Sequence, residues 1–140
     1  MDNNVKFVIV SFIYIILEII WITSNLKMYN SNTIRIQGKL SNMTNTIILY
    51  IIIVYLILLL SIIHIAIPLT LNNIKEEDKL EDKIYKSILY GGSVGFCIYG
   101  IYNLISLIIY ENYEIKIAII DTVWGVFIYS LLTLIYLLLK

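Results

Sequence analysis

Four long apolar segments constrain this chain more than any other feature of its sequence. They cover residues 7–23, 46–71, 85–110 and 115–139. A helix needs about 20 predominantly apolar residues to cross the hydrocarbon core of a bilayer. Hydrophobic residues make up 60% of the chain and charged residues only 14%, with a mean hydropathy of +0.88. We therefore predict an all-α integral membrane protein, a four-helix bundle in which residues 1–140 form a single transmembrane domain.

The polar connections between the spans differ in character. Residues 24–45 are polar, and we expect a strand-like or interface-lying piece there. Residues 72–86 carry many charges of both signs and predict a helical extension that leads into the third span. Residues 111–114 predict a tight turn. No small-residue cleavage site follows the first span, so we interpret it as a retained helix rather than a signal peptide.

Four spans place both termini on the same side of the membrane. Basic residues are more numerous in the termini and the second connection than in the other two connections, and cytoplasmic segments carry an excess of Lys and Arg. We therefore predict that the termini lie in the cytoplasm. The basic residues of the two sides are, respectively, Lys6, Lys75, Lys79, Lys83, Lys86 and Lys140, and Lys27, Arg35, Lys39 and Lys116.

Composition excludes several classes of function. A formal net charge of zero argues against nucleic-acid binding. The single Cys97 provides neither a disulfide nor a thiolate metal site. We predict no cofactor, no metal and no enzymatic activity, with membrane lipids and a second copy or another membrane protein as partners. Abundant isoleucine beside only two alanines suggests an AT-rich genome, such as that of a low-GC bacterium, a protist or a large DNA virus.

Two acidic residues lie inside the predicted spans. Glu18 is followed three residues later by Trp21, and Asp121 is followed three residues later by Trp124. At a rise of 1.5 Å per residue, both carboxylates lie about 8–9 Å inside the side that carries the first and third connections. The third span adds polar side chains at compatible depth, and we predict one shared polar layer. Those residues are Tyr99, Tyr102, Asn103 and Ser106.

Glycines recur where helices would have to approach closely. Gly91 and Gly95 form a small-xxx-small spacing on the third span, which is typical of close helix packing in membranes. Gly125 follows Trp124 directly on the fourth span. We predict that these three glycines lie at helix contacts.

The polar layer has two interpretations. A charge at the centre of a transmembrane helix costs about 2.5–3.5 kcal/mol on insertion scales, and no Lys or Arg lies at this depth. The first interpretation is a binding or transport site, where the carboxylates share a proton or hold a cation, a small solute, a lipid headgroup or a partner's basic residue. The second interpretation is a structural or assembly protein, for example of a viral internal membrane, in which the polar layer only joins the helices. A lipid-acting enzyme with Glu18 or Asp121 as general base lacks a nucleophile–base pair, a histidine cluster and a phosphate loop.

The spacing of these residues resembles that of an uncharacterised family of predicted four-helix membrane proteins, domain-of-unknown-function family 2177. That family carries Asp-x-x-Trp in its first helix, a Gly-rich Tyr-x-x-Tyr-Asp-x-x-Asn run in its third and Asp-x-x-Trp-Gly in its fourth. The fourth-helix motif is intact here as Asp121, Trp124 and Gly125. The resemblance covers nearly the whole chain.

The other two motifs depart from the family pattern. The first helix has Glu18 in place of Asp, and the third has Asn103 in place of Asp and Ser106 in place of Asn. The resemblance implies the four-helix fold but no activity. The replacement of one of the three family carboxylates by Asn103 also weakens any mechanism that needs all three, such as a metal site.

Overall fold

The prediction of an all-helical membrane protein is confirmed. The computed structural model describes residues 2–139, and no strand occurs among them. Four helical stretches are long and apolar enough to cross a membrane. The first and last spans are α1 (Asn3–Gln37) and α6 (Ile115–Leu138). The second comprises α2 (Asn45–Ser61), η1 (Ile62–Ala66) and α3 (Ile67–Leu71), and the third comprises α4 (Leu80–Lys86), η2 (Ser87–Gly92) and α5 (Ser93–Ile109).

The first helix is much longer than the predicted span of residues 7–23. It continues to Gln37, so the expectation of a strand-like or interface-lying piece after Thr23 is wrong for most of that connection. The polar side chains there do not interrupt the helix, because several bond to the carbonyl one turn earlier. Thr33 Oγ1 donates to Tyr29 O at 3.0 Å, for example. The helix ends only at Gly38, which has a φ of 76° and donates its N–H to Ile34 O at 2.7 Å.

The second span contains a π-helical turn, η1, just before Pro68. Proline has no N–H, and its ring would clash with the carbonyl four residues earlier, which is that of His64. The backbone widens there, and the Ile67 N–H bonds to Ile62 O. The span therefore continues through Pro68 as α3 instead of ending.

The charged connection is only partly helical. Residues 72–79 form turns, and the helix begins at Leu80, so the predicted extension is restricted to α4. Lys86 Nζ forms an ion pair with Asp78, and the Lys75 N–H donates to Asp78 Oδ2 at 2.8 Å. These two bonds to the carboxylate hold the pKa of Asp78 below its usual range.

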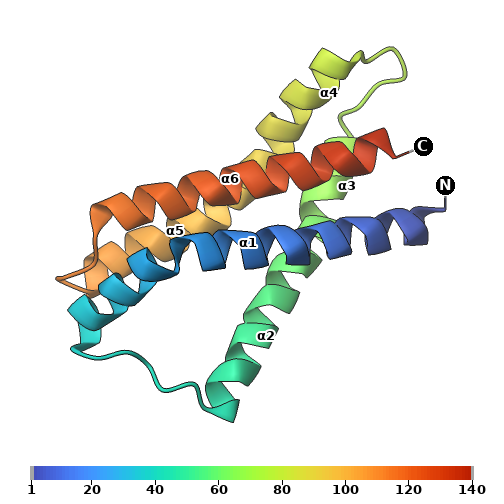
Figure 1. Cartoon of the computed structure of the whole chain (residues 1–140). Coiled ribbons are helices and arrows are strands. Elements are labelled where there is room, and N and C mark those ends of the chain that lie inside the picture. The colour runs from blue at the N-terminus through green and yellow to red at the C-terminus, as the bar shows by residue number, and fades with distance from the viewer. Residues whose placement is uncertain (1, 140) are drawn as a thin grey trace.

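Helix α6 lies against both α5 and α1, and α1 and α6 run in opposite directions (Figure 1). Both ends of the chain lie at the same end of the molecule, as four spans require (Figure 1). The first half of α2 is inclined to this layer and diverges from it toward its N-terminus (Figure 1). The buried core lies where η1 and α3 cross the layer, and its members include Val10, Tyr14, Ile62, Ile128 and Leu132.

The contact between α5 and α6 is made by glycines. A Cβ added at Gly95 would lie 2.2 Å from the carbonyl oxygen of Gly125, so the two backbones touch. A Cβ added at Gly125 would lie 2.4 Å from Cγ of Tyr99. One turn earlier on the third span, a Cβ at Gly91 would lie 2.7 Å from Thr133 Oγ1. Small residues thus bring α5 and α6 as close as helix backbones allow.

Candidate binding cleft

Glu18 is buried in the centre of α1, with 5% of its surface exposed. Its Oε1 atom accepts a hydrogen bond from Trp124 Nε1 at 3.1 Å, and a longer one from Tyr99 OH at 3.3 Å. Both donors come from other helices, α6 and α5. The second carboxylate oxygen, Oε2, accepts no hydrogen bond from any residue between 2 and 139. Glu18 therefore has one oxygen held by the protein and one oxygen free.

Asp121 is only partly buried, and both of its oxygens are occupied. Oδ1 accepts a hydrogen bond from Tyr29 OH at 2.7 Å, and Oδ2 accepts one from Asn103 Nδ2 at 3.1 Å. The same Asn103 amide also donates to Tyr99 O at 2.8 Å. An ionised aspartate at this position would offer no such donor. Asn103 thus supplies a hydrogen bond to Asp121 where a third carboxylate would repel it.

Tyr113, in the turn between α5 and α6, fixes the orientation of the Asn103 amide. Its hydroxyl donates to Asn103 Oδ1 at 2.7 Å, which leaves Nδ2 directed at Asp121. Burial raises the pKa of the Tyr113 hydroxyl, so this group stays protonated and remains a donor. The short turn is thereby tied to the carboxylate on α6.

The two tryptophans connect the two carboxylates crosswise. Trp21 and Trp124 stack with ring centroids 4.2 Å apart and planes inclined by 4°. Trp124 of α6 donates directly to Glu18 of α1. Trp21 of α1 donates to Tyr29 OH at 2.8 Å, and that hydroxyl donates to Asp121 of α6. Each antiparallel helix therefore carries a carboxylate that is served by the tryptophan of the other, once directly and once through a hydroxyl.

The carboxylates lie at two depths rather than in the single predicted layer. Asp121 and Asn103 are each six residues from the helix end beside the α5–α6 turn, or about 9 Å. The donors of Glu18, Tyr99 and Trp124, are nine or ten residues from those ends, or about 14–15 Å. Counting from Thr23 placed both carboxylates at one depth, but the first helix continues to Gln37. Along α5 and α6, the donors of Glu18 therefore lie about one helical turn farther from the α5–α6 turn than Asp121 does.

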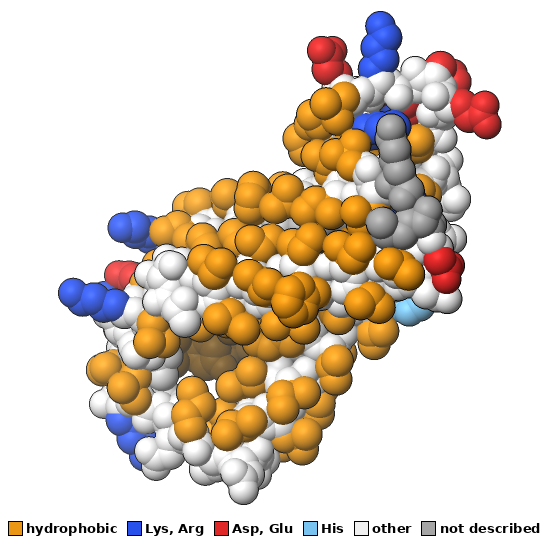
Figure 2. All heavy atoms as spheres, turned by 45° about the vertical axis from the view of Figure 1, so that its right-hand side comes forward, with side chains coloured by type: hydrophobic (Ala, Val, Ile, Leu, Met, Phe, Trp, Pro, Cys, Tyr) orange, Lys and Arg blue, Asp and Glu red, His pale blue; other side chains and the backbone are white. Residues whose placement is uncertain are grey.

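Both carboxylates line one cleft, with a volume of about 760 Å³, between α2 and the layer of α1, α5 and α6. Its walls are mostly aromatic and aliphatic, with Tyr50 and Tyr55 on the α2 side, and no Lys or Arg among residues 2–139 lines it. Figure 2 shows the face hollowed where α2 leaves α1, with hydrophobic side chains around the opening. The cleft exists because the first half of α2 diverges from the other helices.

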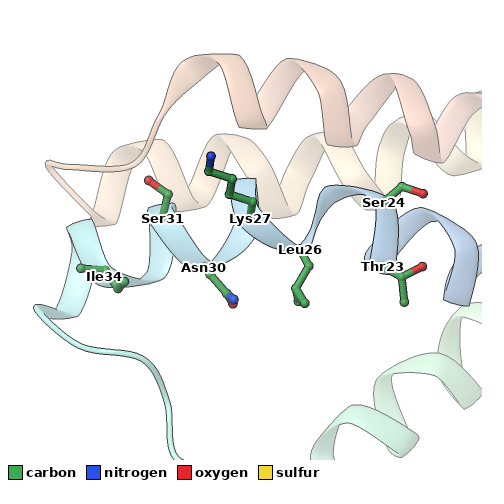
Figure 3. A pocket seen from close by; sticks show the side chains of 7 residues that line it. All are labelled: Thr23, Ser24, Leu26, Lys27, Asn30, Ser31 and Ile34. Atoms are coloured by element: carbon green, nitrogen blue, oxygen red, sulfur yellow. The ribbon is translucent and has the colours of Figure 1, made fainter.

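A second hollow, of about 660 Å³, lies along the C-terminal half of α1. All the side chains that line it belong to that one helix, among them Leu26, Lys27 and Asn30 (Figure 3). Leu26 and Asn30 point to one side of the helix and Lys27 to the other (Figure 3). The hollow is thus a groove on the outside of α1, without the converging groups of the cleft.

The structure brings together six of the eight residues predicted to form the polar layer. Glu18, Trp21, Tyr99, Asn103, Asp121 and Trp124 all belong to the connected hydrogen bonds and ring contacts described above. The other two behave differently. Tyr102 lines the cleft but is 61% exposed, and Ser106 is buried and donates to the carbonyl of Tyr102 in its own helix at 2.8 Å.

Sequence reasoning missed two residues of this site, Tyr29 and Tyr113. Tyr29 lies in the segment that was expected to be non-helical. A signal was nevertheless present, because Trp21, Asn25, Tyr29 and Asn32 follow one another at three- or four-residue steps and continue the polar face of the first span. Nothing in the spacing of Tyr113 points to Asn103.

The site's residues fall within a known sequence family. The family model described as predicted membrane protein (DUF2177) matches residues 3–138. The chain belongs to the DUF2177 family. Searches of curated proteins and of solved structures give no match. Membership of DUF2177 thus agrees with the four membrane-spanning helices and supplies no biochemical role.

Proposed function

We propose that this DUF2177 protein binds a cation within the membrane, in the cleft lined by Glu18 and Asp121. The observation that carries this proposal is the free Oε2 atom of Glu18, on a side chain that is 5% exposed and lines the cleft. A buried carboxylate without a counter-charge is costly, and intramembrane ionisable residues commonly mark ion or substrate sites. A bound cation would remove that cost.

The charge distribution around the cleft supports the same proposal. The two ion pairs among residues 2–139 are Arg35–Glu114 and Lys86–Asp78, and neither involves Glu18 or Asp121. Arg35 pairs with Glu114 beside the α5–α6 turn, at 2.6 Å, so its charge is already engaged. The two carboxylates in the cleft therefore pair with no Lys or Arg in the part of the chain that the structure describes.

The alternative is a structural role, and one observation favours it. Both oxygens of Asp121 accept hydrogen bonds, from α1 and α5, so this carboxylate joins three helices without any ligand. Interhelical hydrogen bonds in membranes contribute about 0.6 kcal/mol on average. We assign this joining role to Asp121 and the binding role to Glu18.

The test is cation-dependent stabilisation of the purified protein in nanodiscs. Thermal unfolding would be followed in chloride salts of sodium, magnesium and tetramethylammonium at matched ionic strength. A ligand that binds only the folded state raises its stability, by about 2.7 kcal/mol at a concentration of one hundred times Kd. We expect at least one cation to raise the unfolding temperature of the wild type.

Glu18→Gln should lose this response, whereas Glu111→Gln, which alters an exposed carboxylate in the α5–α6 turn, should keep it. If no salt stabilises the wild type, or if Glu18→Gln responds as the wild type does, the proposal is wrong. A response lost in both variants would point to surface charge and would also overturn it.

Orientation and assembly are further parts of the proposal. We propose that the chain forms one domain among membrane lipids, with its termini in the cytoplasm, and that a second copy or another membrane protein is its partner. Cys97 is exposed on α5 and would be replaced by serine before new cysteines are introduced. A cysteine at Asn3 should then be protected from impermeant thiol reagents in intact cells, and one at Ser41 should be labelled.

A further inference from the structure

We infer that the cation bound in the cleft is an organic ammonium ion with an apolar body, which reaches Glu18 from the bilayer. This inference rests on the proposed function and names the class of ligand. Three observations carry it: the aromatic walls of the cleft, its donor set, and the surroundings of its mouth.

The walls of the cleft suit an alkylated ammonium group. Seven of its sixteen lining residues are aromatic, including the stacked Trp21 and Trp124 directly beside Glu18. Tyr99 adds a third ring on the same carboxylate. Aromatic faces attract ammonium ions, most strongly where water is excluded, and cages of such rings recognise quaternary ammonium groups. A cleft that combines a free carboxylate oxygen with seven aromatic side chains matches the charge and the surface of such an ion.

The same donor set suits a metal ion poorly. No group of three or more His, Cys, Asp or Glu that could hold a metal occurs among residues 2–139. Calcium takes six to eight oxygen ligands and magnesium an octahedral set, so one free oxygen replaces little of their hydration. An alkylated ammonium needs only charge and apolar contact.

The mouth of the cleft lies among side chains that face hydrocarbon. On α2, Ile51, Val54 and Ile57 line the cleft and are each at least 40% exposed. They belong to a span with a hydropathy of 3.1. The volume of about 760 Å³ lies within the roughly 300–1,000 Å³ range of small-molecule sites. An amphipathic ammonium ion partitions into the bilayer, so it can approach this mouth from the side, with its apolar part along α2.

Fluorescence of the two tryptophans can report ligand binding in the cleft. They are the only tryptophans in the chain, and both line the cleft, so all tryptophan emission reports on this site. The protein in maltoside micelles, which contain no ammonium, would be titrated with benzyltrimethylammonium, its uncharged analogue neopentylbenzene, tetramethylammonium, sodium and magnesium. We expect a saturable emission change with benzyltrimethylammonium, and roughly tenfold weaker binding of tetramethylammonium because it lacks the apolar part. Sodium, magnesium and neopentylbenzene should give no saturable change.

Glu18→Gln should weaken binding of benzyltrimethylammonium at least about tenfold, and Glu111→Gln should leave it unchanged. Should Glu18→Gln fail to fold, the selectivity of the wild type among the five compounds decides by itself. Saturation by sodium or magnesium but not by the ammonium ions would overturn this inference and leave the proposed function standing. No saturable change with any cation, or equal binding of neopentylbenzene, would overturn both.

Lipid headgroups also carry ammonium groups, and we commit to a free solute because the Glu18 carboxylate lies deep in the span. Its donors are about 14–15 Å from the helix ends. Reconstitution into phosphatidylcholine nanodiscs tests this choice. A response to benzyltrimethylammonium that persists there supports the free solute. If phosphatidylcholine alone changes the emission and abolishes the response, the headgroup is the occupant and the inference is wrong.

Discussion

The two sides of α5 show opposite kinds of packing. Toward α6, Gly95 and Gly125 bring the backbones into contact, and an added methyl group would find no room at either position. Toward α2, the same helix faces a cleft of about 760 Å³ lined by Tyr99 and Tyr102. One helix thus has a closed interface on one side and an open one on the other.

The two interfaces have different roles: the closed one positions the residues of the site, and the open one leaves the site accessible. The closed interface holds Tyr99 and Asn103 of α5 beside Trp124 and Asp121 of α6. It thereby determines the positions of the Asp121 carboxylate and of the two groups that donate to Glu18. The open interface leaves Glu18, which has one free oxygen, in the lining of the cleft. Breaking the closed side should therefore destroy the fold, whereas changes on the open side should affect binding more than stability.

The largest effect is expected from Gly95→Ala. Its new Cβ would lie 2.2 Å from Gly125 O, a backbone atom that cannot move aside alone. Overpacking of a tight core typically costs about 1–3 kcal/mol, and we expect the upper part of this range. Gly100→Ala is the matched control, because its nearest neighbour would be Thr122 Cγ2 at 3.8 Å. Thermal unfolding in detergent measures both, and equal stability of the two variants would contradict the closed interface.

A smaller effect is expected from Tyr29→Phe. The change removes the donor to Asp121 Oδ1 and the acceptor of the Trp21 indole N–H. Loss of a hydrogen bond to a charged group costs about 1.5–3 kcal/mol, and the partial exposure of Asp121 favours the lower end. Tyr50→Phe removes a hydroxyl from the open side, where Tyr50 is 61% exposed, and should be neutral. Denaturant unfolding distinguishes them, and a neutral Tyr29→Phe would show that this bond contributes little.

The smallest effect on stability is expected at Asp78, which belongs to neither the closed nor the open interface of α5 and pairs with Lys86. Its pKa is held below the usual range by Lys86 and the Lys75 N–H, so the ionised form stabilises the folded state. That contribution is present above the unfolded pKa of about 3.9 and is lost as the pH falls through the lower folded pKa. Asp78→Asn should therefore unfold slightly earlier than the wild type at neutral pH, and the two should converge as the pH falls below the lowered pKa of Asp78. Glu76→Gln, at an exposed position, should show no such convergence, and a pH-independent difference for Asp78→Asn would contradict the ion pair.

Much of the fold was predictable because the bilayer imposes length and hydropathy on each span. The first helix shows where this reasoning failed. Its polar residues after Thr23 resemble a loop by composition, yet Tyr29, Asn32 and Arg35 are polar because their partners on α6 and the preceding turn are polar. Hydropathy alone cannot distinguish a solvated loop from a helix that bonds to polar neighbours.

The candidate site was predictable in its residues but not in its geometry. The repeated carboxylate–tryptophan spacing identified Glu18 and Asp121, because intramembrane charges are rare and stand out. The crosswise donation between the two motifs depends on the stacking of Trp21 on Trp124, which no spacing along one helix reveals. The cleft depends on the inclination of α2, which has apolar residues on all faces and therefore no periodicity to indicate a direction.

The most direct test of the central claim is a crystal structure with ring-brominated benzyltrimethylammonium. Anomalous scattering locates bromine without reference to the protein. We expect one bromine peak in the cleft between α2 and the layer of α1, α5 and α6, with the ammonium group beside Glu18 Oε2. A fully occupied peak elsewhere, or an empty cleft at a saturating concentration of the compound, would contradict it.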